Sequence, residues 1–154
     1  MYIGFGSIIV SDPDEITRII VEATLLSNVR AIISRGWSSR IAGTTSDLLH
    51  RYPDTILSVR AVPHDWLFPQ VRAVVHHGGA GTTAAGLRAG RPTIVKPFFA
   101  DQFFWGDRVA EMGVGCCIKE LTAENLSAAL RVVSTDESML RTANIVGQKI
   151  REVN

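Results

Sequence analysis

The chain has 154 residues, the length of one ordinary domain. Its hydrophobic fraction of 46% and charged fraction of 20% are typical of globular proteins and exclude a disordered chain. A net charge of +1 excludes nucleic acid or an anionic membrane as an electrostatically attracted main partner, and no apolar run approaches the roughly 20 residues that span a bilayer.

Short apolar runs alternate with helical periodicity along the chain, which predicts parallel β-α-β units. The clearest helix start is at 12–15, where Asp12 can cap the helix and Pro13 suits its first turn. In chain order we expect strands at 2–5, 29–34, 55–59, 72–76, 93–96 and 115–118, and helices from 12 and at 46–51, 79–89, 102–112, 123–133 and 137–153. Residues 1–154 are thus predicted to form one α/β domain, Rossmann-like, with a parallel sheet in three layers.

Two further features concern the setting of this domain. Cys116 and Cys117 are adjacent and make a poor disulfide or metal site, so we expect a reducing, cytoplasmic location and no metal ion. The first strand begins without a lead-in, which favours a domain cut from a larger protein. A compact single-domain protein with trimmed termini is the alternative.

Ligands of such sheets bind beyond the carboxyl ends of the strands. The strongest signal there is the run His77-Gly-Gly-Ala-Gly-Thr-Thr83, after the fourth strand. Gly78, Gly79 and Gly81 let the backbone turn sharply and approach a ligand closely, the following helix offers free N–H groups, and Thr82 and Thr83 add hydroxyls. This pattern favours a bound diphosphate, and it is neither a Walker loop nor a dinucleotide fingerprint. The alternative is a tight strand-to-helix turn with a buried histidine.

The second signal is Asp101-Gln102, after the fifth strand. A carboxylate accepts hydrogen bonds and an amide both accepts and donates, which suits the adjacent hydroxyls of a sugar. Asp101 could instead be the N-cap of the helix that begins near Gln102. Trp66 and Phe68 are expected to cover the core, and the aromatic residues of 98–105 to divide between core and cleft.

The run HHGGAGTTAAGLRAGRPTIVKPFFADQFFWGDRV, residues 76–109, resembles the nucleotide-sugar signature of UDP-dependent glycosyltransferases. It is most similar to the sterol 3-β-glucosyltransferase branch, and YIGFGSI, RGW and PHDWLFPQ support the resemblance. The resemblance implies the C-terminal lobe of a two-lobed GT-B enzyme, with the N-terminal acceptor lobe outside this chain. It implies UDP-glucose as donor substrate, with no separate cofactor, and a sterol acceptor reached through the other lobe. The whole enzyme would be cytoplasmic, with peripheral membrane association.

The resemblance also assigns roles to single positions. His77, Gly79, Gly81, Thr82 and Thr83 match the diphosphate site. Ser7 matches a serine that reaches the phosphates, and the pair Asp101-Gln102 matches the residues that hold the transferred sugar. Trp37 and the segment around Val62 are expected to face the base.

Two departures from the family pattern stand out. A glutamate that binds the ribose in many members is replaced here by Ala84-Ala85-Gly86, and Val59 stands where plant members have a uracil-stacking tryptophan. Trp37 could supply that stacking instead. No residue here is a convincing catalytic base, so we expect the chain to bind the donor without catalysing transfer. The alternative is a naturally separate binding subunit of a two-chain N-acetylglucosaminyltransferase.

Overall fold

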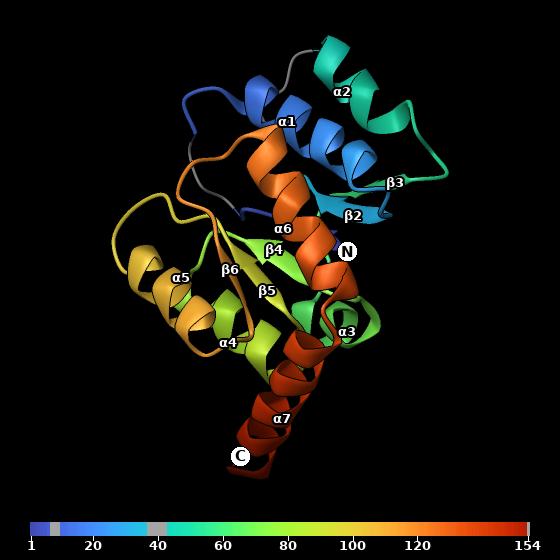
Figure 1. The fold of residues 1–154 in the computed structure, drawn as a ribbon. Coiled ribbons are helices and arrows are strands. Elements are labelled where there is room, and N and C mark those ends of the chain that lie inside the picture. The colour runs from blue at the N-terminus through green and yellow to red at the C-terminus, as the bar shows by residue number, and fades with distance from the viewer. Residues whose placement is uncertain (7–9, 37–42, 154) are drawn as a thin grey trace.

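The computed structural model describes residues 1–6, 10–36 and 43–153. A six-stranded parallel sheet has the order β3-β2-β1-β4-β5-β6, with helices on both faces (Figure 1). The strands are β1 (Tyr2–Ile3), β2 (Ala31–Ser34), β3 (Ile56–Val59), β4 (Val74–His76), β5 (Thr93–Val95) and β6 (Gly115–Cys117). The larger helices are α1 (Pro13–Leu26), α2 (Gly43–His50), α4 (Ala80–Arg88), α5 (Gln102–Glu111), α6 (Ala123–Thr135) and α7 (Glu137–Val153). The predicted three-layer α/β fold is therefore confirmed.

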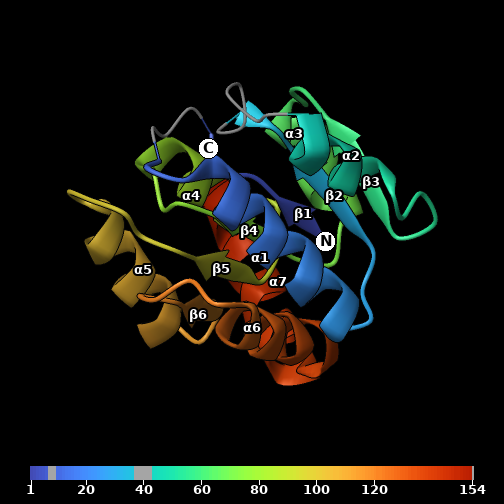
Figure 2. The same ribbon diagram turned by 90° about the horizontal axis from the view of Figure 1, so that it is seen from above.

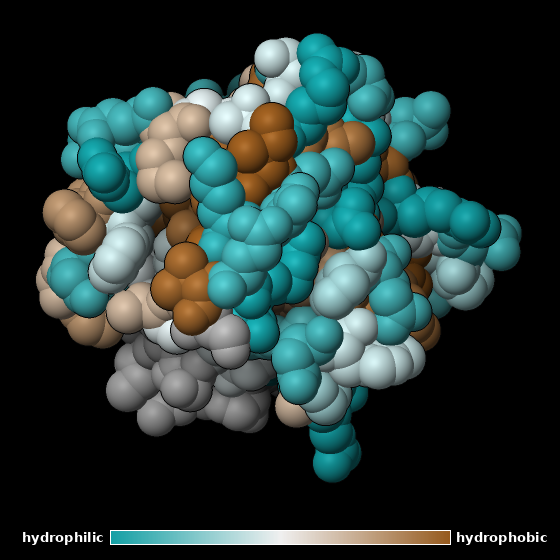
Figure 3. All heavy atoms as spheres, turned by 90° about the horizontal axis from the view of Figure 1, so that it is seen from below, coloured by the Kyte–Doolittle hydropathy of each residue, from teal (hydrophilic) through white to brown (hydrophobic). Residues whose placement is uncertain are grey.

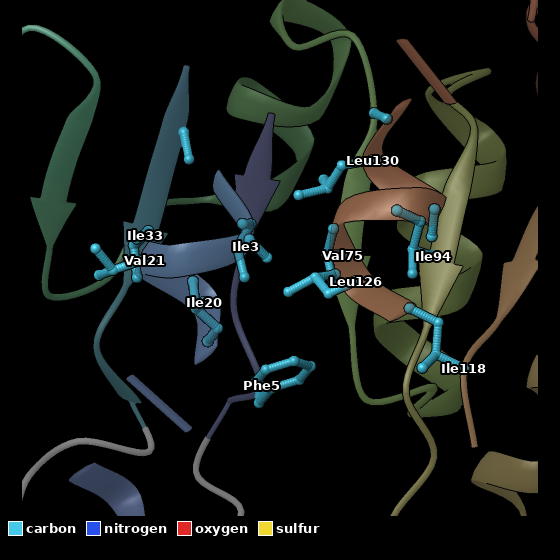
Figure 4. Close-up of a cluster of buried hydrophobic side chains, with 14 of the residues drawn as sticks. Ile3, Phe5, Ile20, Val21, Ile33, Val75, Ile94, Ile118, Leu126 and Leu130 are labelled. Atoms are coloured by element: carbon cyan, nitrogen blue, oxygen red, sulfur yellow. The ribbon is translucent and has the colours of Figure 1, made fainter. Parts of the chain in front are cut away.

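The core explains why the helices divide between the two faces. Alternate residues of a strand point to opposite faces, so Ile3 packs with Ile20 of α1 and Leu126 of α6 (Figure 4). On the other face, Tyr2 and Val74 pack with Phe68, while Val95 packs with α5 and α7. The two helical layers can be followed in the view turned by 90° (Figure 2).

Side chains cap two helix starts, and Asp12 does so as predicted. Asp12 accepts a hydrogen bond from the N–H of Glu15 at 3.0 Å, and Thr122 accepts one from Asn125 at 3.0 Å. The sequence did not predict α3 (His64–Leu67) or the 3-10 helix η2 (Phe68–Gln70), because elements of four and three residues are too short to show a helical period. Trp66 is 62% exposed, so the prediction that it covers the core was wrong, whereas Phe68 is fully buried as predicted.

The outer surface shows few large apolar areas on the side of α7. Seen from below, it is mostly hydrophilic with separate apolar patches (Figure 3). Ile145 and Val153 of α7 are exposed there. In the part of the chain that the structure describes, no helix is long and apolar enough to cross a membrane.

Candidate functional site

The strand order fixes where a ligand crevice should lie. The strand order reverses between β1 and β4, because β2 and β3 are added toward one edge of the sheet and β5 and β6 toward the other, and ligands of doubly wound sheets bind at the carboxyl ends of the strands at such a point. Gly6 follows β1 with φ 64°, and a Cβ atom on it would lie 3.4 Å from Cε1 of His77. A Cβ atom on Gly36, after β2, would lie 2.5 Å from the carbonyl oxygen of Gly6. The loops after β1, β2 and β4 therefore meet at this point.

The loop after β4 is also in contact with the start of α5. Gly78 has φ 91°, a left-handed conformation that favours glycine. A Cβ atom there would lie 2.7 Å from Cγ1 of Val95 and 3.0 Å from the carbonyl oxygen of Gln102. Only a glycine fits at position 78. This close contact brings the run from His77 to Thr83 and the pair Asp101-Gln102 together in one site.

The N-terminus of α4 is open to a ligand. No side chain caps this helix, whose N-cap is Gly79, and the N–H of Thr83 makes the first hydrogen bond to the Gly79 carbonyl at 2.9 Å. No hydrogen bond from a described residue reaches the N–H groups of Ala80, Gly81 and Thr82, which leaves them for an anion. An added Cβ on Gly81 would meet nothing within 4 Å, so there is space in front of this turn.

Two polar side chains at this helix end have buried atoms without partners. Oγ1 of Thr83, whose side chain is buried, and Nδ1 of His77 make no hydrogen bond within the described part of the chain. Burial, together with the nearby His64, lowers the pKa of His77, so its imidazole is neutral near neutral pH and can donate from one nitrogen. A diphosphate would supply acceptors for these donors.

The neighbouring His76 has a structural role. It is fully buried, and its Nδ1 accepts a hydrogen bond from the N–H of Gly78 at 3.0 Å. Burial, followed by the charges of His77 and His64, lowers the pKa of His76 to about 3, which keeps the ring neutral. His76 therefore fixes the turn that presents His77.

Asp101 and Gln102 differ in what they can offer a ligand. Asp101 is exposed and stands at the N-cap position of α5, as that alternative predicted, but its side chain makes no cap hydrogen bond. Its Oδ2 accepts a hydrogen bond from Nε1 of Trp105 at 3.2 Å. Gln102 is buried, and its Oε1 accepts from the N–H groups of Phe98 at 2.8 Å and Phe99 at 3.1 Å. Only the Nε2 group of Gln102 is then left to bind a sugar hydroxyl.

Comparison with known proteins assigns the family. Residues 39–152 match the family described as erythromycin biosynthesis protein CIII-like, C-terminal domain. The chain belongs to this family. It is 51% identical over 152 residues to the sterol 3-beta-glucosyltransferase of Emericella nidulans, and 49% identical over 162 aligned positions to that of Cryptococcus neoformans. These alignments cover 98% and 100% of this chain but only 11% and 10% of the relatives' length, so the chain spans about a tenth of these proteins.

Solved structures with the same fold are glycosyltransferases. UDP-glucose: anthocyanidin 3-O-glucosyltransferase in complex with UDP matches with a TM-score of 0.83 at 21% identity, covering 98% of this chain and 35% of that one. Os79 from O. sativa in complex with UDP matches with a TM-score of 0.83 at 15% identity, covering 98% and 36%. At these identities the likeness shows the fold, which is that of one lobe of the GT-B glycosyltransferases.

Three further candidate residues of this erythromycin CIII-like domain are Ser7, Trp37 and Val62. Ser7 and Trp37 lie outside the described residues. The side chain of Val62, which is partly buried, packs with the small core of Tyr2 and Phe68. Within the described chain, the N–H of Val62 makes no hydrogen bond, which leaves its peptide group for a base.

Sequence reasoning expected Gly78 to allow a sharp turn but did not predict its contact with Gln102, and it missed the role of Trp105. The positive φ of Gly78 is a backbone property that no local pattern distinguishes from the neighbouring Gly79, whose φ is −59°. Trp105 was grouped with the apolar residues of its helix. Its spacing of four residues from Asp101 was the available signal, because side chains at i and i+4 meet on one face of a helix.

Proposed function

We propose that this chain is the donor-binding lobe of an enzyme that transfers glucose from UDP-glucose to the 3-hydroxyl of a sterol, with inversion. The observation that carries the proposal is the uncapped N-terminus of α4, preceded by His77 and by Gly78, which lies against Gln102 at the start of α5. The near 50% identity to fungal sterol 3-beta-glucosyltransferases supports the acceptor class.

In this proposal the diphosphate lies at the start of α4. Backbone N–H groups of Gly81 and Thr82, the threonine hydroxyls and the His77 ring would donate to its oxygens. Each hydrogen bond to a charged oxygen contributes roughly 1.5–3 kcal/mol, so three or four of them, less ordering costs, suit a dissociation constant in about the micromolar range. The sugar would extend toward Asp101 and the Nε2 group of Gln102, and the base toward Val62.

The same donors would act on the reaction. As the bond between the anomeric carbon and the diphosphate breaks, negative charge builds on the leaving oxygen. Donors that already point at this position stabilise that charge without reorganisation, which is commonly the largest catalytic contribution. The base that takes the proton of the acceptor hydroxyl is proposed to lie on the other lobe, and the whole enzyme would meet its sterol as a peripheral, cytoplasmic protein. The separate-subunit alternative gains no support from these relatives.

Binding measurements test the donor site. Calorimetry with UDP, UDP-glucose and ADP should give micromolar to millimolar dissociation constants for the uridine ligands. The change His77→Ala should weaken the binding of UDP at least several-fold. A folded sample that does not bind UDP would contradict the phosphate site. A matched control is His50→Ala, because His50 is an exposed histidine on α2 and not part of the loop that follows β4.

Transfer measurements test the division of labour. The 154-residue chain should transfer no glucose to ergosterol or cholesterol by itself, because base catalysis, typically about 10²–10⁴-fold, and acceptor positioning are both proposed to come from the other lobe. A protein that joins this domain to the preceding region of a fungal relative should be active. Turnover by the isolated chain would overturn this division, and an inactive joined protein would count against the sterol acceptor.

A further inference from the structure

We propose that Trp105 is a positioning residue that holds the carboxylate of Asp101 ready for the donor sugar. The inference rests on the proposed function, in which Asp101 binds the sugar. It adds a residue whose contribution to sugar affinity would pass through the hydrogen bond from Trp105 Nε1 to Asp101 Oδ2 at 3.2 Å.

Asp101 has little else to hold its side chain in place. It is exposed, its side chain makes no cap hydrogen bond to α5, and within the described residues its carboxylate takes part in no other hydrogen bond. An exposed carboxylate without a partner samples several rotamers, and a ligand must select one of them at an entropic cost. A single tether from Trp105 removes part of this cost before the sugar binds.

The indole is itself held in a defined place. Trp105 is half-buried on α5, and its backbone N–H group donates to the backbone carbonyl of Asp101 at 3.1 Å. Its indole ring contacts the ring of Phe104 edge-to-face, with centroids 5.0 Å apart. The next residue, Gly106, fixes the helix against the sheet, because a Cβ atom there would lie 2.7 Å from Sγ of Cys117. The tether therefore starts from a rigid element.

The backbone of Asp101 is fixed separately from its side chain. The amide of Gln102 holds the preceding turn through Phe98 and Phe99, in which Ala100 has φ 57°, a conformation that residues with a Cβ atom rarely adopt. With Oδ2 bound to the indole, Oδ1 keeps its lone pairs for hydroxyl groups of the sugar. Trp105 thus decides which carboxylate oxygen faces the ligand.

The test removes the indole N–H and compares two ligands. In Trp105→Phe, the dissociation constant of UDP-glucose should rise about three- to tenfold, the range expected for one lost hydrogen bond, while that of UDP stays within about twofold. Benzothienylalanine at position 105, in which sulfur replaces the N–H group, should give the same result with the shape of the ring preserved. Trp66→Phe is the matched control, since it makes the same change at an exposed tryptophan of α3 and should leave the ratio of the two constants unaltered.

A double variant separates this inference from the function it rests on. Asp101→Ala should weaken the binding of UDP-glucose more than that of UDP. Adding Trp105→Phe to this variant should then leave both dissociation constants unchanged. If Asp101→Ala has this effect but neither change at Trp105 does, or if UDP weakens equally in a folded Trp105 variant, the positioning role is overturned. If Asp101→Ala weakens both ligands equally, the sugar-binding role of Asp101 itself fails.

Discussion

Gly79 lies so close to the side chain of His77 that a Cβ atom on residue 79 would be 2.5 Å from Nε2 of the imidazole. Real Cβ atoms essentially never approach another atom so closely, so the ring could not keep its place beside any other residue. The φ of Gly79 is −59°, which every residue can adopt. Glycine is therefore required at this position by contact with His77 and not by backbone conformation.

Gly79→Ala should displace the His77 ring and weaken UDP binding about tenfold or more, the effect of losing one hydrogen bond to a charged oxygen. Calorimetry on the variant would measure it. In a His77→Ala background the same change should have little further effect, since the displaced ring is no longer present. A full additional loss in that background would mean that Gly79 acts on the ligand directly.

Gly81→Ala should stabilise the protein but lower its affinity for UDP. Gly81 is inside α4 and its added methyl group would meet no protein atom within 4 Å. Replacing a helical glycine by alanine should raise the free energy of unfolding by up to about 1 kcal/mol. UDP affinity should nevertheless fall, because the methyl group would enter the space proposed for the phosphates. Urea unfolding and calorimetry give the two values, and unchanged UDP binding would place the diphosphate elsewhere.

Gln102→Ala should destabilise the protein and also weaken the binding of UDP-glucose. Its buried Oε1 accepts from Phe98 and Phe99, and two N–H groups would lose their acceptor. We expect the free energy of unfolding to fall by about 1–3 kcal/mol, measured by urea unfolding. Asp101→Ala is the comparison, because its exposed carboxylate caps no helix and should affect stability far less. Equal stability of both variants would contradict this difference.

UDP-glucose should bind more tightly as the pH falls. Burial and the nearby His64 lower the pKa of His77 in the free protein, and a bound diphosphate would raise it again by favouring the imidazolium. Affinity should therefore increase, by about three- to tenfold, as pH falls from about 8 to 5.5. Calorimetry across this range should show the increase in the native chain and a flat profile in His77→Ala. A flat native profile would mean that the protonation of His77 is not coupled to binding.

Stability should decrease over the same acidic range because of His76. Its pKa is about 3 in the folded state against 6.5 for an unperturbed histidine, so the unfolded chain binds more protons. The stability contributed by the neutral ring is present above about pH 6.5 and is lost as pH falls, by about 2 kcal/mol at pH 5. Urea unfolding at the two ends of this range would measure it. His76→Asn keeps an acceptor for Gly78 and should lose most of this pH dependence, and an unaltered dependence would assign it to other groups.

The sequence by itself determined the parts that depend on local pattern. Alternating apolar runs and helical periods predicted the six strands of a parallel sheet and the larger helices, since a strand or helix must bury one face wherever it lies. The cap Asp12 was readable because a capping side chain bonds a residue three positions away. The run from His77 to Thr83 was readable because a phosphate-binding turn uses consecutive residues.

Only the tertiary structure decided how these parts meet. The contacts of Gly6 with His77 and of Gly78 with Gln102 join segments that are far apart in the chain, and they follow from the strand order and the packing of α5 on the sheet. The different roles of Asp101 and Gln102 also depend on burial, because a helix start exposes one neighbour and buries the next. Residue types determine which hydrogen-bond donors and acceptors are available. Packing determines which of them the protein itself uses and which it leaves for a ligand.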